Sequence, residues 1–301
     1  MNEQTVNSVA VIGLGSMGMG AAKSCIRAGL DVYGVDLNPT ALEALGNAGA
    51  KAVSTDANQF AQELDAVLLL VINAKQVKSI LFDSGVANNL KPYTPVMVSA
   101  TISAQDAKEI EAGLKGHNLI MLDAPVSGGA LKAEAGEMTI MASGSIQAFE
   151  KLDPVLKATA GKVYNIGTEI GLGATVKIIH QLLAGVHIAA GAEAMALAAR
   201  ANIPLDLMYD VVTNAAGNSW MFENRMKHVV DGDYSPKSMV DIFVKDLNLV
   251  TDTAQDLKFP LPLASTALNM FTSASNAGFG KEDDSAVIKI FNGIELPGVE
   301  K

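Results

Sequence analysis

The chain has 301 residues, of which 49% are hydrophobic and 18% are charged, a composition typical of a globular protein with enough apolar material for two buried cores. Its formal net charge of -10 excludes the dense cationic face that binds nucleic acid or anionic lipid without regard to sequence. The single cysteine, Cys25, excludes an intramolecular disulfide and fits a reducing compartment.

The first residues, MNEQTVNS, have no basic patch followed by an apolar core, so they do not resemble a signal peptide. No uninterrupted apolar stretch is long enough to span a bilayer. We therefore expect a cytoplasmic protein with no membrane or nucleic-acid partner.

Short apolar runs alternate with longer helical patterns in the first part of the chain. The runs are SVAVIG, DVYGVD, DAVLLLVIN, TPVMVSA, LIMLDAPVS, EMTIMASG and KVYNIG. Runs that are apolar at every position are typical of a parallel sheet covered by helices on both faces. The sequence thus predicts an α/β domain over residues 1–167, with Met138 and Met141 in its core.

The pattern becomes helical after residue 167. The segment TVKIIHQLLAGVHIAAGAEAMALAARANI has no proline and is rich in Ala, Leu, Ile and Met, which predicts one long helix. Further helices are expected over residues 205–215, 219–230, 238–257 and 262–276. We predict an all-helical second domain over residues 168–301, joined to the first by the long helix.

A glycine-rich turn follows the first apolar run. In GLGSMG, Gly13 allows a tight turn, Gly15 lets a pyrophosphate approach the backbone, and Gly18 permits close packing of the following helix. Together with the intervening Leu14, Ser16 and Met17, they form a Rossmann-type dinucleotide site in this interpretation. The alternative is a glycine turn without a ligand.

Asp36 ends the second apolar run. A carboxylate at that place accepts hydrogen bonds from a ribose diol and repels a 2′-phosphate, so the sequence predicts NAD rather than NADP as cofactor. A solvated carboxylate at the end of a strand is the simpler alternative.

A second polar turn ends the run LIMLDAPVS. Ser127, Gly128 and Gly129 offer a hydroxyl and unobstructed N–H groups at the carboxyl edge of the sheet, where open α/β folds bind ligands. We predict a cradle for a substrate carboxylate, against the alternative of an ordinary turn.

Lys177 lies near the start of the long helix, and Gln181 is four residues later, so both project from one face. A lysine there could act as a general base near neutral pH only if its amine is neutral, which burial and a nearby cationic nicotinamide would favour. A solvated surface lysine is the alternative.

The chain resembles the β-hydroxyacid dehydrogenase family, which includes 3-hydroxyisobutyrate, tartronate semialdehyde and 6-phosphogluconate enzymes. Four blocks carry the resemblance in order over nearly the whole length: GLGSMG, DAPVSGG continuing to AEAGEMTIMASG, GLGATVKIIHQ and KDLNL. The resemblance implies a Rossmann domain, a helical domain that completes the active site and usually forms an oligomer, and NAD(P)-dependent oxidation of a hydroxy acid. We expect a homodimer or homotetramer.

The resemblance also implies residue roles. Lys177 corresponds to the family's catalytic lysine, and the turn at residues 127–129 to its grip on the substrate carboxylate. Thr101 and Lys245 match residues near the nicotinamide, so we expect both to contact the cofactor or the substrate. Asp246 is expected to orient the local structure.

The chain departs from its relatives at two places. Ala100 replaces the serine of a family Ser-Thr pair, and Gln181 replaces an asparagine and follows His180. The longer amide and the imidazole suit a polyhydroxylated acid, and KIIHQLLAGVHIAAGAEA looks most like the L-threonate dehydrogenase group within the family. 3-Hydroxyisobutyrate and tartronate semialdehyde are the alternative substrates.

The segment AAGNSWMFENR leaves two interpretations open. In one, the substrate pocket is lined by Asn218, Ser219 and Trp220; in the other, Asn218 or Ser219 caps the start of a helix and Trp220 is packed. Four histidines without ligand spacing indicate no metal site. A non-catalytic NAD-binding sensor and an imine reductase on the same fold remain as other functions, and Lys177 argues against both.

Overall fold

The computed structural model describes residues 6–299. The chain divides into two compact units, Met1–Lys177 and Ile178–Lys301. The expected domain boundary lies at residue 167, whereas the first unit continues to Lys177. It does so because the first turn of the helix that follows is hydrogen-bonded to the sheet of that unit.

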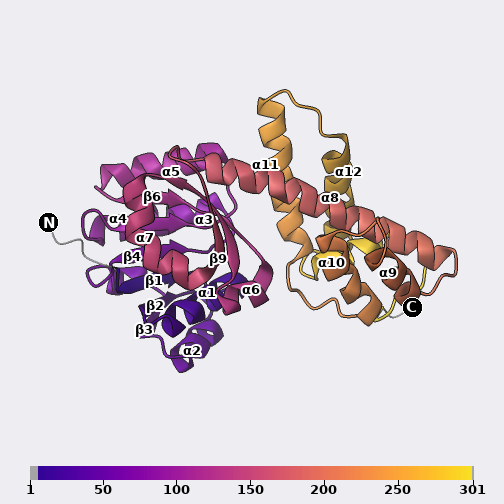
Figure 1. Cartoon of the computed structure of the whole chain (residues 1–301), viewed down its shortest axis with the longest axis horizontal. Helices are drawn as coiled ribbons and strands as arrows, with labels where there is room; N and C mark the ends of the chain where they lie inside the picture. Colours follow the sequence, from indigo (N-terminus) through magenta and orange to yellow (C-terminus); the bar gives the residue numbers. More distant parts are fainter. Residues whose placement is uncertain (1–5, 300–301) are drawn as a thin grey trace. The chain divides into compact units, whose positions relative to one another are not determined.

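The first unit is a sheet with helices on both faces (Figure 1). Its strands are β1 (Ser8–Ile12), β2 (Asp31–Val35), β3 (Ala52–Ser54), β4 (Ala66–Leu69), β5 (Pro95–Val98), β6 (Ile120–Asp123), β7 (Val126–Ser127), β8 (Met138–Gly144) and β9 (Ala160–Gly167). Its helices are α1 (Ser16–Arg27), α2 (Pro39–Asn47), α3 (Ala74–Lys78), α4 (Val86–Asn89), α5 (Ala104–Gly116), α6 (Gly129–Ala135) and α7 (Ile146–Thr159).

The strand order is β3-β2-β1-β4-β5-β6-β8-β7, and β9 pairs with β8. The chain moves outward from β1 through β2 and β3, then resumes with β4 on the other side of β1. Open α/β sheets bind ligands where the strand order reverses in this way, outside the carboxyl ends of the strands. The glycine-rich turn directly follows β1 and so lies at that point.

The prediction of a parallel sheet is correct from β3 to β6 and for the pair of β8 and β9, but it is wrong where β8 joins the rest of the sheet. Strand β8 runs antiparallel to both β6 and β7. Residues 128–137, which include the short helix α6, connect β7 to β8, and a parallel crossover needs about a dozen residues or more. The sequence also failed to indicate the short strand β3, and it predicted β6 and β7 as one strand.

Two apolar cores fill the two faces of the sheet. One face carries α3, α4 and α5, whose residues Val77, Val86 and Ile110 pack with alternate strand residues. The opposite face carries α1, α2 and α7, and there Cys25 and Met138 are buried. Burial raises the pKa of the Cys25 thiol to about 12, against a smaller lowering by Arg27.

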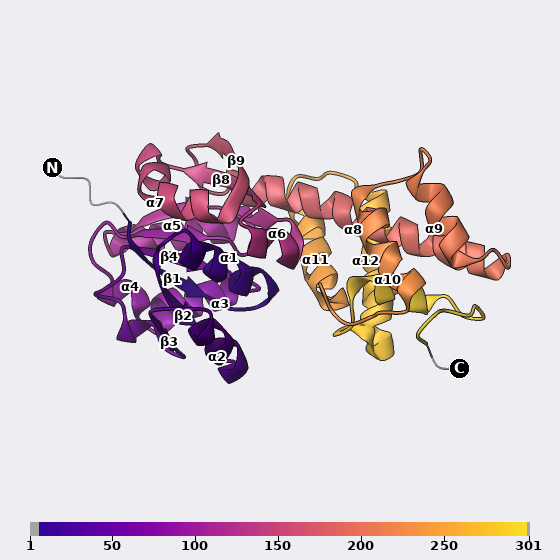
Figure 2. The same cartoon turned by 60° about the horizontal axis from the view of Figure 1, so that its bottom comes forward.

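The second unit is helical, as predicted. Its elements are most of α8 (Leu172–Arg200), then α9 (Leu205–Thr213), α10 (Trp220–Asp231), α11 (Val240–Asp256), α12 (Pro262–Ala274) and two short turns, η3 (Ser275–Phe279) and η4 (Asp284–Ile290). Figures 1 and 2 show α11 and α12 side by side, and Phe243 stacks on Phe271 between them at 5.1 Å. Glycines on α8 permit close packing, because a side chain at Gly191 would press on Phe222 at 3.1 Å.

Helix α8 is long enough and apolar enough, by length and composition alone, to cross a membrane. Half of its most apolar window is buried within the protein, as in the core helix of a globular domain, and Ile188 and Met195 belong to the helical core.

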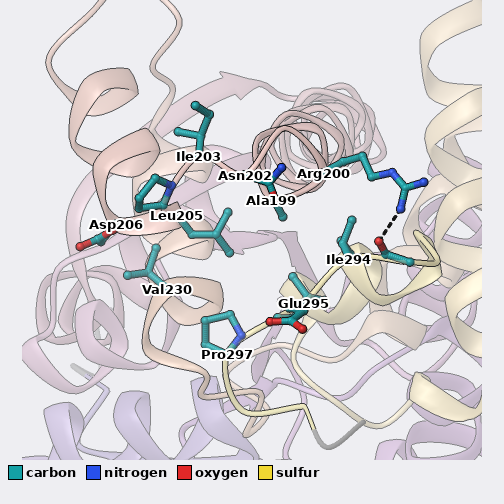
Figure 3. A pocket seen from close by; sticks show the side chains of 13 residues that line it. Ala199, Arg200, Asn202, Ile203, Leu205, Asp206, Val230, Ile294, Glu295 and Pro297 are labelled. Carbon is teal, nitrogen blue, oxygen red and sulfur yellow. Dashed lines mark hydrogen bonds between the residues drawn. The ribbon is translucent and has the colours of Figure 1, made fainter.

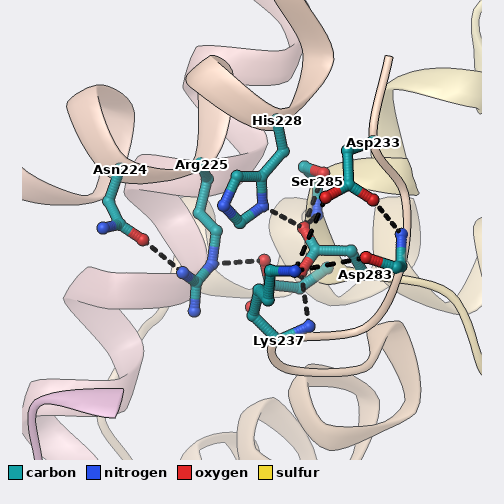
Figure 4. A network of polar contacts seen from close by, with 9 residues as sticks. Asn224, Arg225, His228, Asp233, Lys237, Asp283 and Ser285 are labelled. Atoms are coloured by element: carbon teal, nitrogen blue, oxygen red, sulfur yellow. Dashed lines mark hydrogen bonds and ion pairs between the residues drawn. The ribbon is translucent and has the colours of Figure 1, made fainter. Parts of the chain in front are cut away.

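A buried polar network ties η4 to α10 (Figure 4). Asp283 accepts hydrogen bonds from the Ser285 hydroxyl at 2.6 Å and the Lys237 N–H at 3.0 Å, and lies 2.9 Å from His228 Nδ1. Arg225 pairs with the neighbouring Asp284 at 2.6 Å. Burial would raise the pKa of Asp283, but the hydrogen bonds from His228, Ser285 and Lys237 outweigh it and lower the pKa to about 2.

Candidate active site

The glycine-rich turn requires glycine at two of its three positions. Gly13 has φ +92°, and a Cβ there would lie 2.7 Å from the Leu70 carbonyl oxygen; a Cβ at Gly18 would lie 1.7 Å from the Gly13 carbonyl oxygen. A Cβ at Gly15 would meet nothing within 4 Å, so this glycine faces open space. Gly18 thus packs against the turn itself, and Gly15 leaves room for a ligand to reach the backbone.

Helix α1 begins at this turn, and no side chain caps it. By contrast, Asn38, Ser103 and Ser145 cap α2, α5 and α7. First-turn N–H groups need an acceptor, and together with the helix dipole they attract anions. Ser16 lies exposed at the start of α1, whereas the side chains of Leu14 and Met17 pack toward the apolar core.

Asp36 lies beside the glycine-rich turn. Its Oδ2 accepts a hydrogen bond from the Leu14 N–H at 2.6 Å, and its Oδ1 accepts one from the Asn38 N–H at 2.8 Å. Each carboxylate oxygen can accept a second hydrogen bond. The open space at Gly15, the uncapped helix and this carboxylate fit a pyrophosphate followed by a ribose diol, and thus NAD.

The segment after β5 is mostly buried. Ser99 donates its hydroxyl to the Ala124 carbonyl oxygen at 2.8 Å, and the side chains of Ala100 and Ile102 belong to the apolar core. Thr101 between them is half-buried. Ala100, which replaces the family's serine, therefore serves as a packing residue here.

The turn at residues 127–129 also depends on glycine. Gly128 has φ +134° and Gly129 has φ +74°, and a Cβ at Gly128 would lie 2.9 Å from the Lys132 Cβ. Such positive φ values favour glycine, because other residues rarely adopt them. Ser127, the last residue of β7, is half-buried beside Gly128.

Lys177 is the sixth residue of α8 and is only 6% exposed. The alternative of a solvated surface lysine is therefore wrong. The first turn of its helix is fixed by Asp123, whose Oδ2 accepts hydrogen bonds from the Gly171 N–H at 3.0 Å and the Ala174 N–H at 2.9 Å. Burial raises the pKa of Asp123, while the donors from Ala174, Gly171 and Ser143 oppose the rise.

Asp123 was not predicted to have a functional role. Its signal in the sequence is a carboxylate at the end of an apolar strand, directly before the PVSGG turn. The partners that define its role are 48 and 51 residues away, so the local pattern alone does not reveal them.

In the helical unit, one carboxylate holds two of the predicted residues. Asp246 Oδ2 accepts a hydrogen bond from Gln181 Nε2 at 2.5 Å, and its Oδ1 pairs with Lys245 Nζ at 2.5 Å. His180 Nδ1 lies 3.0 Å from Gln181 Oε1. The amide of Gln181 is therefore fixed at both ends, and Asp246 orients its surroundings as expected.

The start of α10 follows one of the two interpretations in part. Ser219 caps the helix, because its hydroxyl accepts a hydrogen bond from the Phe222 N–H at 3.0 Å. The packing of Trp220 that belongs to the same interpretation is wrong, since its side chain is 57% exposed. Asn218 donates to Glu223 at 3.2 Å, and its buried Oδ1 has no hydrogen-bond partner among residues 6–299.

A separate hollow lies at the far end of α8 (Figure 3). It lies between the end of α8, the start of α9 and the segment from Gly293 to Pro297, and Arg200 donates to the Gly293 carbonyl oxygen at 2.6 Å. None of the predicted site residues lines it. Within the part of the chain that the structure describes, no group of three His, Cys, Asp or Glu could hold a metal ion.

Comparison with known proteins places this arrangement in a family. The model for the NAD-binding domain of 6-phosphogluconate dehydrogenase matches residues 8–167, and the model for the NAD-binding region of NADP-dependent 3-hydroxyisobutyrate dehydrogenase matches residues 171–291. A Rossmann-type unit with a glycine turn and a strand-end carboxylate, followed by a helical unit, defines a nicotinamide-dependent dehydrogenase.

Individual relatives agree. The L-threonate dehydrogenase of Pectobacterium atrosepticum is 76% identical over 99% of this chain and 98% of its own, and that of Cupriavidus necator is 53% identical over 97% and 98%. A crystal structure of 3-hydroxyisobutyrate dehydrogenase from Salmonella typhimurium, 69% identical, superposes with a TM-score of 0.92 over 94% of this chain and 99% of that one.

The chain belongs to the 3-hydroxyisobutyrate dehydrogenase-like family of β-hydroxyacid dehydrogenases. It is an NAD-dependent dehydrogenase that acts on the CH–OH group of a small hydroxy acid. The predicted family, fold class, cofactor and reaction class are confirmed.

Proposed function

We propose that the protein oxidises L-threonate at C2 to 2-dehydro-L-erythronate. The observation that carries this proposal is the agreement among the relatives: proteins named L-threonate dehydrogenase match nearly the whole chain at identities from 76% to 53%. The buried amide of Gln181, which Asp246 and His180 hold in place, supports it, because a polyhydroxylated acid can hydrogen-bond to a buried polar group whereas a methyl group cannot.

Lys177 is the proposed general base. When bound, NAD supplies the acceptor for the hydride that leaves C2. The hydroxyl proton passes to the neutral Nζ of Lys177 as the C2–O bond becomes a carbonyl, and in the reverse direction the ammonium returns that proton. The burial of Lys177 keeps this transfer away from bulk water.

The turn at residues 127–129 is proposed to hold the substrate carboxylate. The Ser127 hydroxyl and the N–H groups of Gly128 and Gly129 are donors at the carboxyl edge of the sheet. Gln181 has one Nε2 hydrogen left after its bond to Asp246, and this hydrogen is proposed to select a hydroxyl of the substrate. Asn218 is proposed to contact the substrate as well.

The cofactor contacts follow from the first unit. The N–H groups at residues 14–18 are proposed to face the pyrophosphate, and Asp36 the ribose diol. Thr101 and Lys245 are proposed to contact the nicotinamide end. A sensor without catalytic activity would need neither Lys177 nor the 127–129 turn.

A second substrate has its own support. The solved relative at 69% identity carries the name 3-hydroxyisobutyrate dehydrogenase. That acid has a methyl group where L-threonate has hydroxyls. The amide of Gln181 could therefore hydrogen-bond to L-threonate, whereas the methyl group would offer it no partner.

We further propose a cytoplasmic homodimer or homotetramer. The helical unit exposes several large apolar side chains that a partner copy would cover: Ile179, Leu183, Leu197, Leu207, Val211, Trp220 and Leu263. Light scattering coupled to size exclusion measures the assembly, and a monomer at micromolar concentration would contradict this part.

The substrate is tested by NADH formation with L-threonate, its stereoisomers, C5 and C6 sugar acids and 3-hydroxyisobutyrate. Tartronate semialdehyde is tested in the reverse direction, by consumption of NADH. We expect the highest kcat/KM with L-threonate. A higher value for 3-hydroxyisobutyrate would establish the second candidate, and NAD binding without turnover of any acid would point to a sensor.

A further inference from the structure

Two buried polar residues face each other at the edge of the sheet. Asp123 on β6 and Ser143 on β8 are register partners in the antiparallel pair, and both are fully buried. The Ser143 hydroxyl donates a hydrogen bond to Asp123 Oδ2 at 3.2 Å. The two side chains therefore form one polar group inside an apolar layer.

Asp123 and Ser143 bind the first turn of α8 through hydrogen bonds. Asp123 Oδ2 accepts the N–H groups of Gly171 and Ala174, and the Ser143 hydroxyl oxygen accepts the N–H of Gly173 at 3.0 Å. Three backbone donors at the start of a helix are thus bound by two side chains from different strands. A negative charge or an oxygen acceptor at this end stabilises a helix.

The fit leaves little freedom. A Cβ at Gly173 would lie 2.6 Å from the Met141 carbonyl oxygen and 2.8 Å from the Asp123 carbonyl oxygen, so the helix backbone rests directly on the two strands. Gly171 has φ +100°, a conformation that other residues rarely adopt. Lys177 follows Ala174 by three residues and therefore lies on the same side of the helix, one turn later.

We propose that Asp123 and Ser143 are positioning residues that fix the first turn of α8 and thereby place the Nζ of Lys177 for proton transfer. The proposal rests on the proposed role of Lys177 as general base. Asp123 also begins the segment that leads to the 127–129 turn, so one strand end fixes both the proposed carboxylate cradle and the proposed base. Because small displacements of a catalytic group lower the rate steeply, loosening the first turn of α8 is expected to lower kcat.

The chain offers a matched control for the test. Ser145 lies two residues after Ser143 and caps α7, because its hydroxyl accepts the Ala148 N–H at 3.2 Å. Ser143→Ala and Ser145→Ala each remove one hydroxyl from one helix start, but only the first helix carries Lys177. Comparable losses of Tm are expected for both.

The experiment measures steady-state kinetics with L-threonate and NAD for both variants, together with the primary deuterium isotope effect on kcat with C2-deuterated L-threonate. For Ser143→Ala we expect kcat to fall about tenfold, a KM for NAD within about twofold of the parent, and a larger isotope effect because chemistry becomes more rate-limiting. For Ser145→Ala we expect kcat and the isotope effect to stay at the parent values.

Asp123→Asn provides a second measurement, because it keeps an acceptor oxygen for the helix N–H groups. We expect a smaller loss of kcat than for Asp123→Ala, if the alanine variant folds. Equal kcat values and isotope effects for Ser143→Ala and Ser145→Ala would overturn the proposal.

Lys177→Ala distinguishes failure of the positioning proposal from failure of the proposed general-base role. Near-normal kcat in Lys177→Ala would remove Lys177 as the base whatever Ser143→Ala does. An inactive Lys177→Ala beside a fully active Ser143→Ala would instead leave the base in place and reject only the positioning role.

Discussion

The amide nitrogen of Gln181 lies 2.5 Å from Oδ2 of Asp246, which is almost fully buried between α8 and α11. The other carboxylate oxygen pairs with Lys245, so one side chain fixes both a predicted specificity residue and a predicted cofactor contact. A substitution at any of these three residues is therefore expected to change the position of the other two side chains.

Shortening the amide should therefore change the substrate preference. Gln181→Asn draws the amide back by one methylene and breaks its bond to Asp246, so we expect measurable turnover with an altered order of kcat/KM across the hydroxy-acid panel. Gln255→Asn, a change of the same kind late in α11, is the control. An unchanged order would show that Gln181 does not select the substrate.

Replacing Asp36 should reduce the preference for NAD. Asp36→Ala removes both the proposed ribose contact and the hydrogen bond to the Leu14 N–H, so we expect the ratio of kcat/KM for NAD over NADP to fall by at least about tenfold. Asp31→Ala, at the exposed start of the same strand, controls for loss of a carboxylate. A constant ratio would exclude Asp36 as the discriminating residue.

Removing the amine of Lys177 should abolish most of the chemistry. We expect Lys177→Ala to lower kcat by about 10²-fold or more while NAD binding and the folded state persist. Lys177→Arg should not restore turnover, because a guanidinium stays protonated at any accessible pH. If both variants kept the parent pH profile and rate, Lys245 would become the next candidate.

The glycine turn should govern binding of the acid. Ser127→Ala removes one donor and is expected to raise KM for the hydroxy acid several-fold, whereas Gly128→Ala adds a Cβ at φ +134° against Lys132 and should impair turnover more. Gly116→Ala, where the added Cβ meets nothing within 4 Å, is the matched control. Loss of NAD affinity in parallel with activity would assign this turn to the cofactor or the fold.

Acid should weaken the network around Asp283. Its pKa in the folded protein, about 2, lies below the ordinary value of 3.8, so the carboxylate stabilises the fold above about pH 4 and this contribution is lost as the pH falls toward 2. The shift corresponds to about 2 kcal/mol.

The matching variant is Asp283→Asn, followed by urea unfolding between pH 3 and 7. We expect a lower free energy of unfolding at pH 7 and a difference from the parent that narrows toward pH 3. Asp231→Asn, on an exposed carboxylate of the same helix region, should leave that pH dependence unchanged. A constant difference at every pH would mean that the carboxylate charge is not what stabilises the network.

The sequence predicted most elements because their signals are local. The apolar runs match β1, β2, β4, β5, β6, β8 and β9, and the periodic segments match α8 to α12 within a few residues. Gly13 and Gly18 were likewise visible, since a tight turn before a helix admits no side chain there. The uncapped start of α1 could not be predicted, because it depends on which acceptors lie nearby.

The remaining features arise from contacts between distant segments. The antiparallel direction of β8 follows from the short connection through α6, and strand patterns carry no direction. The anchoring of α8 by Asp123 joins residues about fifty positions apart. The exposure of Trp220 reflects the surface of the helical unit, which a helical period alone does not specify.

The burial of Cys25 also makes the chain a convenient host for site-specific labelling. Its thiol is buried, and its pKa, raised to about 12, keeps it protonated at neutral pH. Maleimide and iodoacetamide reagents should therefore not modify Cys25. A cysteine introduced at an exposed position, such as Leu131 beside the 127–129 turn, would then be the one group that a dye modifies. Substrate capture can in this way be followed by fluorescence without first removing a native thiol.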